Sequence, residues 1–325
     1  MIIATEKLTR KYGRLVAVDS VDLEVYEGEI FGFLGPNGAG KTTTIHMLCT
    51  LLKPSGGEAW VAGYNVEHEQ TLVRRNIGLV FQEPTLDENL TATENLVFHG
   101  MIYGLTGRYL EERIKEVMKL ALLWERRNDL VKTFSGGMKR RLEIARGLVH
   151  LPKVLFLDEP TLGLDPQTRK HIWDYIRRTR EETGTTVFMT THYMDEAENC
   201  DRIAIIDHGR IIACDTPDNL KQMVKGDVVE VTSSKVHQLA AFLEERFEVK
   251  PEFIQEGLKF EVQRADELLP VLLQQAGTGL IEKVNFAKPT LDDVFLRLTG
   301  KSMRDEDADP RGEFRRRIGM RLRKG

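Results

Sequence analysis

The chain has 325 residues, of which 41% are hydrophobic and 30% charged, and its formal net charge is −4. This length suits two domains better than one, and the composition is that of a soluble globular protein. The negative net charge argues against a protein whose main task is to grip nucleic acid, so we expect no nucleic-acid partner. Three cysteines form no metal-ligand cluster in the sequence and predict reduced thiols in the cytosol: Cys49, Cys200 and Cys214.

The sequence also lacks the signals that direct a chain into or across a membrane. Its N-terminus has no basic region followed by an apolar stretch, so we expect no signal peptide. The longest apolar runs, IFGFLG and VLFL, have the length of strands and fall short of the roughly 18 to 20 residues that cross a bilayer. A role in transport would therefore require a separate membrane partner.

Taken in chain order, the first 151 residues predict strands and then helices. Residues 1–30 alternate apolar and polar side chains, which is typical of half-buried antiparallel strands. IFGFLG is a buried strand that runs into a glycine-rich turn, and residues 41–52 are predicted as a helix that ends at KPSGG. Residues 84–151 are predicted to be a mainly helical subdomain.

The following segments predict a parallel sheet. KVLFLDEP and TTVFMTTH are further buried strands, and helices are expected at residues 167–182 and 195–199. Strands that alternate with helices indicate a mainly parallel sheet with both faces covered. We therefore expect an α/β domain over residues 1–220.

The composition changes after Thr216 and Pro217. Residues 227–300 predict strand, helix, two strands, helix and strand, the order of a ferredoxin-like α+β domain, followed by the helix LDDVFLRL. This domain has no catalytic constellation, and it can regulate, support a dimer, contact a membrane partner or simply pack. Residues 301–325 are predicted to form a basic, flexible tail, either solvated or in contact with anionic lipid headgroups.

The strongest chemical signal is GPNGAGKT, which fits the phosphate-loop pattern G-x-x-x-x-G-K-[ST]. Glycines let successive backbone N–H groups surround phosphate oxygens, and the following helix adds its positive end. Lys41 supplies a charge for the β- and γ-phosphates, and the Thr42 hydroxyl is a ligand for Mg²⁺. The predicted nucleotide-binding residues here are Gly35, Pro36, Asn37, Gly38, Ala39, Gly40, Lys41, Thr42 and Thr43.

The strand KVLFLDEP ends in two adjacent carboxylates, which need a cation or a chemical task. Asp158 is predicted to hold Mg²⁺ through water. Glu159 would then lie near the γ-phosphate and act as the general base for the attacking water. With the phosphate loop, these residues predict a P-loop NTPase that binds ATP and Mg²⁺.

FSGGMKRRLEIARGLV, which begins at Phe134, resembles the signature of ABC ATPases, usually written LSGGQ. Ser135, Gly136 and Gly137 open a helix whose free N–H groups form a second anion site. The resemblance implies that this site faces the γ-phosphate of a partner's nucleotide, so that two head-to-tail subunits enclose two ATP molecules. Phe134 keeps an apolar side chain where the family has leucine, and Met138 replaces the family's glutamine.

Other elements resemble this family in the expected order. Gln82 in LVFQEP resembles the Q-loop glutamine, which senses Mg²⁺ and the attacking water and links the helical subdomain to the membrane partner. Asp165 in LGLDP resembles the D-loop aspartate, and His192 in TTHYMDEAE resembles the switch histidine at the γ-phosphate. Tyr12 in RKYG stands where the family places an aromatic ring that stacks on adenine.

The resemblance implies a RecA-like core with an antiparallel β-subdomain and a helical subdomain. The ending PTLDDVFLRLTG resembles ATP-binding subunits of the daunorubicin-resistance type, which belong to the type-two exporter class of ABC transporters. That likeness implies a peripheral ATPase on the cytoplasmic face of the cell membrane. It would pair with a second copy of itself or a paralogous ATPase, and with an integral membrane permease.

Two other classes remain to be weighed. ABC ATPases of DNA repair carry a long coiled coil between the P-loop and the signature, whereas Lys41 and Ser135 are only 94 positions apart. Ribosomal relatives carry two ATPase halves in one chain, and this chain has one. The signature and His192 argue against a P-loop kinase or switch protein. These comparisons favour an exporter ATPase.

Overall fold

The computed structural model describes residues 1–224, 226–254, 257–262, 264–276 and 279–300. The chain divides between Thr216 and Pro217 into two compact units. The predicted basic tail, residues 301–325, lies outside the described residues. Among the residues that are described, no helix is both long and apolar enough to cross a membrane.

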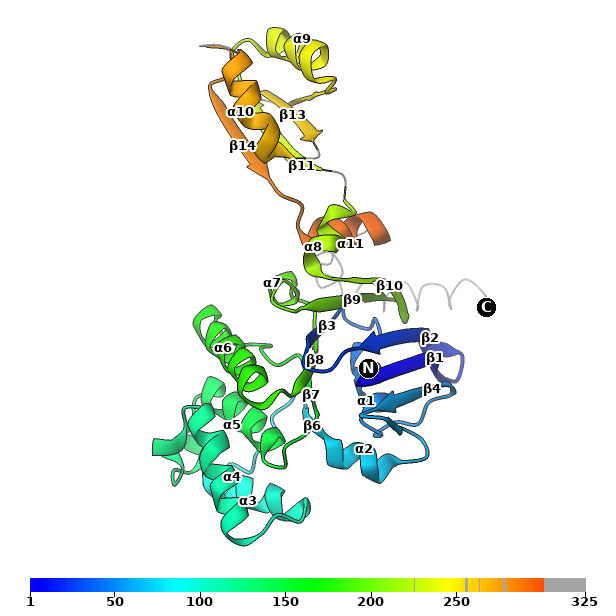
Figure 1. Ribbon diagram of the computed structural model, residues 1–325, viewed down its shortest axis with the longest axis vertical. Coiled ribbons are helices and arrows are strands. Elements are labelled where there is room, and N and C mark those ends of the chain that lie inside the picture. Colours follow the sequence, from blue (N-terminus) through cyan, green and yellow to red (C-terminus); the bar gives the residue numbers. More distant parts are fainter. Residues whose placement is uncertain (225, 255–256, 263, 277–278, 301–325) are drawn as a thin grey trace, which may run out of the picture. The chain divides into compact units, whose positions relative to one another are not determined.

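A six-stranded sheet forms the centre of the first unit (Figure 1). Its order is β10-β9-β3-β8-β7-β6, and all neighbours are parallel except β10, which pairs antiparallel with β9. The strands are β3 (Ile30–Leu34), β6 (Ile77–Val80), β7 (Val154–Asp158), β8 (Thr186–Thr191), β9 (Arg202–Asp207) and β10 (Arg210–Asp215). Every residue of β3, β7 and β8 is buried, as expected for parallel strands covered on both faces.

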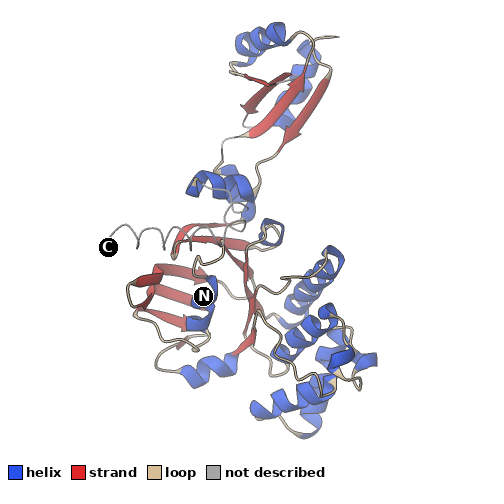
Figure 2. Ribbon diagram, turned by 180° about the vertical axis from the view of Figure 1, so that it is seen from behind, coloured by secondary structure: helices blue, strands red, loops and turns tan. Residues whose placement is uncertain are grey.

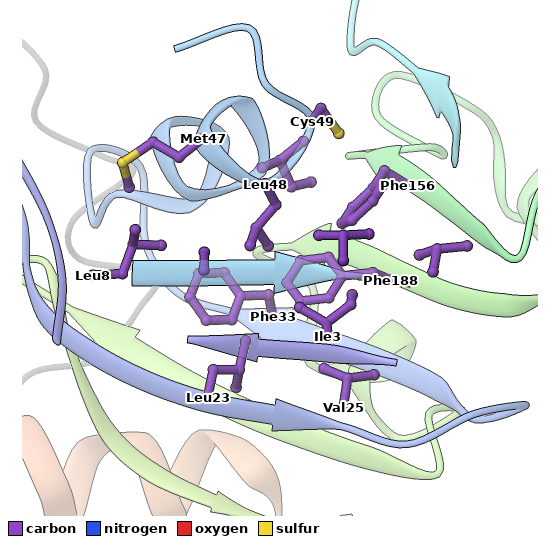
Figure 3. Close-up of a cluster of buried hydrophobic side chains, with 14 of the residues drawn as sticks. Ile3, Leu8, Leu23, Val25, Phe33, Met47, Leu48, Cys49, Phe156 and Phe188 are labelled. Carbon is purple, nitrogen blue, oxygen red and sulfur yellow. The ribbon is translucent and has the colours of Figure 1, made fainter. Parts of the chain in front are cut away.

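A second, antiparallel sheet covers one side of this unit. Its order is β2-β1-β4-β5, and its strands are β1 (Ile3–Tyr12), β2 (Leu15–Val25), β4 (Gly56–Val61) and β5 (Tyr64–Asn65). Figure 3 shows the core between this sheet and the central one, where Leu8 and Leu23 meet Phe33 and Phe188. The antiparallel strands expected in residues 1–30 are confirmed.

Helix α1 (Lys41–Leu48) is shorter than the sequence predicts. The expected helix over residues 41–52 is wrong at its end, because Thr50 adopts a left-handed conformation with φ of 61°. The amides of Leu51 and Leu52 both donate to the carbonyl oxygen of His46, which closes the last turn. The chain therefore leaves the helix before it reaches KPSGG.

Helices cover the other side of the central sheet (Figure 2). Their bounds are α3 (Ala92–Ile102), α4 (Gly107–Leu120), α5 (Gly136–Leu148) and α6 (Pro166–Thr183), while the short α2 (Gln70–Asn76) and α7 (Met194–Ala197) follow β5 and β8. Residues 84–151 are mainly helical, as predicted, with short 3-10 turns at Trp124–Arg126 and Val131–Thr133. Leu110, Ile114 and Val117 supply the buried stripe of α4.

From residue 227 on, the second unit has the element order that the sequence predicts, and a short helix that was not predicted precedes it. Strands β11 (Asp227–Thr232), β12 (Glu252–Ile254), β13 (Gly257–Val262) and β14 (Lys283–Ala287) form an antiparallel sheet of order β12-β13-β11-β14. Helices α9 (Val236–Phe247) and α10 (Ala265–Ala276) contribute to its core, and α8 (Pro217–Gln222) contacts α11 (Leu291–Thr299). The predicted α/β class, with a small α+β addition, is confirmed.

One buried arginine joins the helices to the central sheet. Arg140 of α5 is 7% exposed, and its guanidinium forms an ion pair with the carboxylate of Glu143 at 3.0 Å. The guanidinium donates hydrogen bonds of 2.6 to 3.2 Å to four backbone carbonyls, those of Phe81, Asp158, Glu159 and Pro160. A planar guanidinium has enough N–H groups for all of these acceptors, which an ammonium lacks. Arg140 therefore fixes the chain beyond β6 and β7 to the start of α5.

Replacing Arg140 by Met should destabilise the first unit, because buried carbonyls and Glu143 would lose their partner. We expect Arg140→Met to lower the free energy of unfolding by about 3 to 5 kcal/mol. Urea denaturation followed by tryptophan fluorescence measures this unit, because all three tryptophans (Trp60, Trp124 and Trp173) belong to it. The control is Arg178→Met, which changes an exposed arginine of α6. Equal stability of the two variants would contradict this role for Arg140.

Candidate functional site

Three buried strands deliver the predicted site residues to one edge of the central sheet. Strands β3, β7 and β8 are parallel, so their carboxyl ends lie at the same edge. The glycine-rich loop follows β3, Glu159 follows β7, and His192 follows β8. Residues distant in the sequence therefore meet here, as the motifs predict.

The loop after β3 has the backbone that its glycines were expected to allow. Gly38 and Gly40 have φ of 83° and 109°, a region that other residues rarely adopt. Gly35 has no room for a side chain, because a Cβ atom there would lie 2.3 Å from the carbonyl oxygen of Ile206. Helix α1 begins directly at Lys41, so its N–H groups and positive end face the loop.

Lys41 connects this loop to the acidic end of β7. Its ammonium donates to the carbonyl oxygens of Gly35, at 2.7 Å, and Pro36, at 3.1 Å. It also lies 3.3 Å from Oε1 of Glu159, and both side chains are buried. The cation is thus held where the loop and the carboxylate meet.

The second carboxylate is tied to α1 and β8 by hydroxyl groups. Oδ1 of Asp158 accepts hydrogen bonds from Oγ1 of Thr42, at 3.3 Å, and of Thr190, at 2.5 Å. Thr190 also accepts from the backbone N–H of Glu159 at 3.0 Å. One hydroxyl therefore fixes the positions of both acidic residues, and three hard oxygen atoms gather at this point.

Glu159 is held charged and in a strained backbone conformation. Burial alone would raise the pKa of its carboxyl, but the imidazole of His192 and the ammonium of Lys41 lower that pKa below its usual value. Oε1 lies 3.3 Å from Nδ1 of His192 and from Nζ of Lys41. Its φ of 46° is left-handed, which costs about 1 to 3 kcal/mol for such a residue. Contacts from Arg140 and Thr190 to the surrounding backbone hold this conformation.

The signature residues open helix α5 at the protein surface. Ser135 is exposed and caps the helix, because its Oγ accepts from the backbone N–H of Met138 at 3.3 Å. Gly137 has no space for a side chain, since a Cβ atom would lie 2.4 Å from Cγ2 of Thr168. Asp165 caps α6 and accepts from the backbone and hydroxyl of Thr168 at 3.0 and 2.6 Å. The signature and the D-loop helix are therefore in contact.

Gln82 and Tyr12, which were also predicted to belong to the site, have exposed side chains. Gln82 lines a cavity of about 150 Å³ together with Gly136, Arg140 and Pro160. Tyr12 is 46% exposed at the end of β1, and the guanidinium carbon of Arg10 lies 4.7 Å from its ring centroid. The roles predicted for these two side chains stay predictions.

Two residues that position the site escaped the sequence reasoning. Thr190 lies in the buried run TTVFMTTH, which indicates only a strand. Arg140 lies three positions after Gly137 of the signature, and the sequence offers no sign that its charge is buried. Only the fold shows that Arg140 is buried, because the sequence around it is typical of a solvated helix face.

Comparison with known proteins assigns both units to described families. The family model for ABC transporters matches residues 18–162. The model described as "ATP-binding protein DrrA1-3-like, C-terminal domain" matches residues 216–299. The two matches fall on the two units that the structure separates.

Relatives that match nearly the whole chain support the same assignment. The daunorubicin/doxorubicin resistance ATP-binding protein of Streptomyces peucetius is 40% identical over 96% of each chain. The Nod factor export ATP-binding protein I of Cupriavidus pinatubonensis is 39% identical over 94% of this chain and 92% of its own.

Among solved structures, a dimeric ATP-binding cassette in a post-hydrolysis state with ADP and phosphate is similar. It is 30% identical, with a TM-score of 0.59, over 66% of this chain and 98% of its own. These likenesses confirm the predicted family and the prediction that the chain binds ATP. The chain belongs to the ABC transporter family, as an ATP-binding and ATP-hydrolysing exporter subunit of the daunorubicin-resistance type.

Proposed function

We propose that Glu159 is the general base of ATP hydrolysis at the edge formed by β3, β7 and β8. The supporting observation is an ionised carboxylate held between Lys41 and His192. In this proposal Glu159 takes a proton from water, and the water oxygen attacks the γ-phosphorus. The bond from that phosphorus to the bridging oxygen breaks, which leaves ADP and phosphate.

The remaining residues of the site bind and orient the nucleotide. Residues 35–43 bind the phosphates through Lys41 and through backbone N–H groups of the loop, and Tyr12 stacks on adenine. His192, beside Glu159, contacts the γ-phosphate and keeps the base oriented. Positioning and fixed charge supply most of the catalysis in phosphoryl transfer, and both are features of this buried edge.

Mg²⁺ fits the donors that the structure brings together. Magnesium prefers oxygen ligands, and the Thr42 hydroxyl and Asp158 carboxylate lie 3.3 Å apart. These two groups and the amide oxygen of Gln82 would hold the ion, with Asp158 acting through water. When bound, the ion neutralises charge on the β- and γ-phosphates.

The working form is a head-to-tail dimer with a second copy or a paralogous ATPase. Ser135 and Gly136 are exposed at the start of α5, so the free N–H groups of its first turn can meet a phosphate of another chain. The similar cassette in its post-hydrolysis state is itself a dimer. Each site would take its P-loop from one chain and its signature from the other.

The dimer acts on a separate integral membrane permease. The relatives are named for drug resistance and for Nod factor export, which supports export as the direction of transport. In this proposal the chain is peripheral, on the cytoplasmic face of the cell membrane. Residues 1–220 supply the ATPase domain and residues 227–300 an accessory domain. ATP-dependent closure moves the permease through the helical subdomain near Gln82.

Changing Glu159 to Gln tests the general base directly. Gln keeps the size of the side chain but cannot accept the proton, so turnover should fall by about 10²- to 10⁴-fold. Binding of a fluorescent ATP analogue should be retained, and Glu27→Gln, at an exposed position, should behave as the wild type in both assays. Undiminished phosphate release by Glu159→Gln would rule out this role.

Changing Ser135 to Arg tests the shared site. A bulky cation at the start of α5 should block ATP-dependent dimerisation, measured as molar mass in solution, while one chain still binds nucleotide. Ser234→Arg places the same charge on an exposed serine of the second unit and should leave dimerisation intact. Normal ATP-driven dimerisation by Ser135→Arg would contradict the model.

A further inference from the structure

A buried carboxylate lies four residues after His192. Glu196 of α7 is 1% exposed, and both of its oxygens accept hydrogen bonds from threonine hydroxyls. Oε2 accepts from Thr191 at 2.7 Å, and Oε1 accepts from Thr161. A carboxylate so deeply buried is costly unless donors surround it, and here they come from separate segments of the chain.

Each of the two threonines is close in sequence to a residue of the proposed site, one to His192 and one to Glu159. Thr191 immediately precedes His192, and its hydroxyl also accepts from the backbone N–H of Tyr193 at 2.9 Å. Thr161 is fully buried in the loop that leaves Glu159. Glu196 therefore joins the backbone that carries His192 to the backbone that carries Glu159.

A third contact comes from the helix that the D-loop begins. Nε of Arg169, in the first turns of α6, lies 3.7 Å from Oε1 of Glu196. Its guanidinium carbon lies 4.3 Å from the ring centroid of Tyr193, and that ring is 4.1 Å from the ring of His192. The backbone N–H of Arg169 donates to the carbonyl oxygen of Asp165 at 2.9 Å. Continuous contacts thus run from Asp165 to His192.

We propose that Glu196 is a positioning residue that fixes His192 relative to Glu159 and makes this position depend on α6. The proposal rests on the role proposed above for His192 in hydrolysis. Glu196 touches neither Glu159 nor the phosphate loop through any hydrogen bond in the described part of the chain, so it acts through the threonines and Arg169. A second subunit that contacts Asp165 would then change the orientation of His192 in the same chain as that Asp165.

The first test measures the position of His192 without any chemistry. In the full chain labelled with ¹⁵N-histidine, the ring signals of His192 are assigned by their loss in His192→Ala. Glu196→Ala should shift or broaden these signals, and Glu198→Ala, an exposed glutamate of the same segment, should leave them unchanged. Unaltered His192 signals in folded Glu196→Ala would overturn the proposal.

The second test asks whether Glu196 acts through His192. Glu196→Ala should lower kcat by up to about 10²-fold, the size of effect that a small misplacement causes, while the Kd for ATP stays within about twofold. In the double variant with His192→Ala, the loss should not exceed that of His192→Ala alone. Losses that multiply would show a separate, structural effect and would overturn the proposal.

One further variant, together with the single variant His192→Ala, keeps the result interpretable. Glu196→Gln preserves the volume and one acceptor oxygen, so it should lie between wild type and Glu196→Ala, and it replaces that variant if Glu196→Ala does not fold. Should His192→Ala retain full turnover, the proposed role of His192 would fail, while the ring signals would still report whether Glu196 positions it. The two failures are therefore distinguishable.

Discussion

The site depends on keeping one carboxylate charged, buried and correctly aimed. Glu159 loses most of its contact with water, and this loss alone favours the neutral acid. Lys41 and His192 reverse that preference by lowering the pKa of the carboxyl, so Glu159 is ionised at neutral pH. The carboxylate follows β7 in a left-handed conformation that local sequence would not choose. Its position is therefore a product of the whole first unit.

The packing of the central sheet supplies part of this positioning. The parallel sheet brings the ends of β3, β7 and β8 together, and Phe188 packs 5.4 to 5.6 Å from the rings of Phe31, Phe33 and Phe156. Hydroxyl and guanidinium groups then set the final positions, through Thr190 in the sheet and Arg140 from the helices. Helix α5, which begins with the signature, thus holds the backbone around Glu159 of its own chain, and we propose that its exposed N-terminus meets a phosphate of another chain. The proposed binding at the surface and the proposed chemistry in the interior therefore both depend on α5.

The sequence alone predicts those features of the fold and the site that depend on the spacing of neighbouring residues. GPNGAGKT predicts a phosphate-binding loop because its glycines and the helix that follows are close in sequence. The two carboxylates Asp158 and Glu159 are recognisable because they come directly after an apolar run. The end of α1 was missed: Thr50 is left-handed and accepts hydrogen bonds from Arg74, a residue outside its own segment. Arg140, Thr190 and Glu196 were missed for a related reason: each looks like an ordinary polar residue until the fold buries it.

A single chain also cannot display the half of the site that a second chain would supply, so the most direct test mixes two defective subunits. Lys41→Ala removes the phosphate-binding charge, and Ser135→Ala removes the signature hydroxyl without placing a bulky cation in the interface, so neither variant alone should hydrolyse ATP at the wild-type rate. In a mixed dimer, one site combines the intact Lys41 of one chain with the intact Ser135 of the other. Our account predicts that mixing restores ATP hydrolysis, to about a quarter of the wild-type rate if subunits pair at random and the sites work independently. A mixture as inactive as its components would show that the two motifs do not complete each other across an interface.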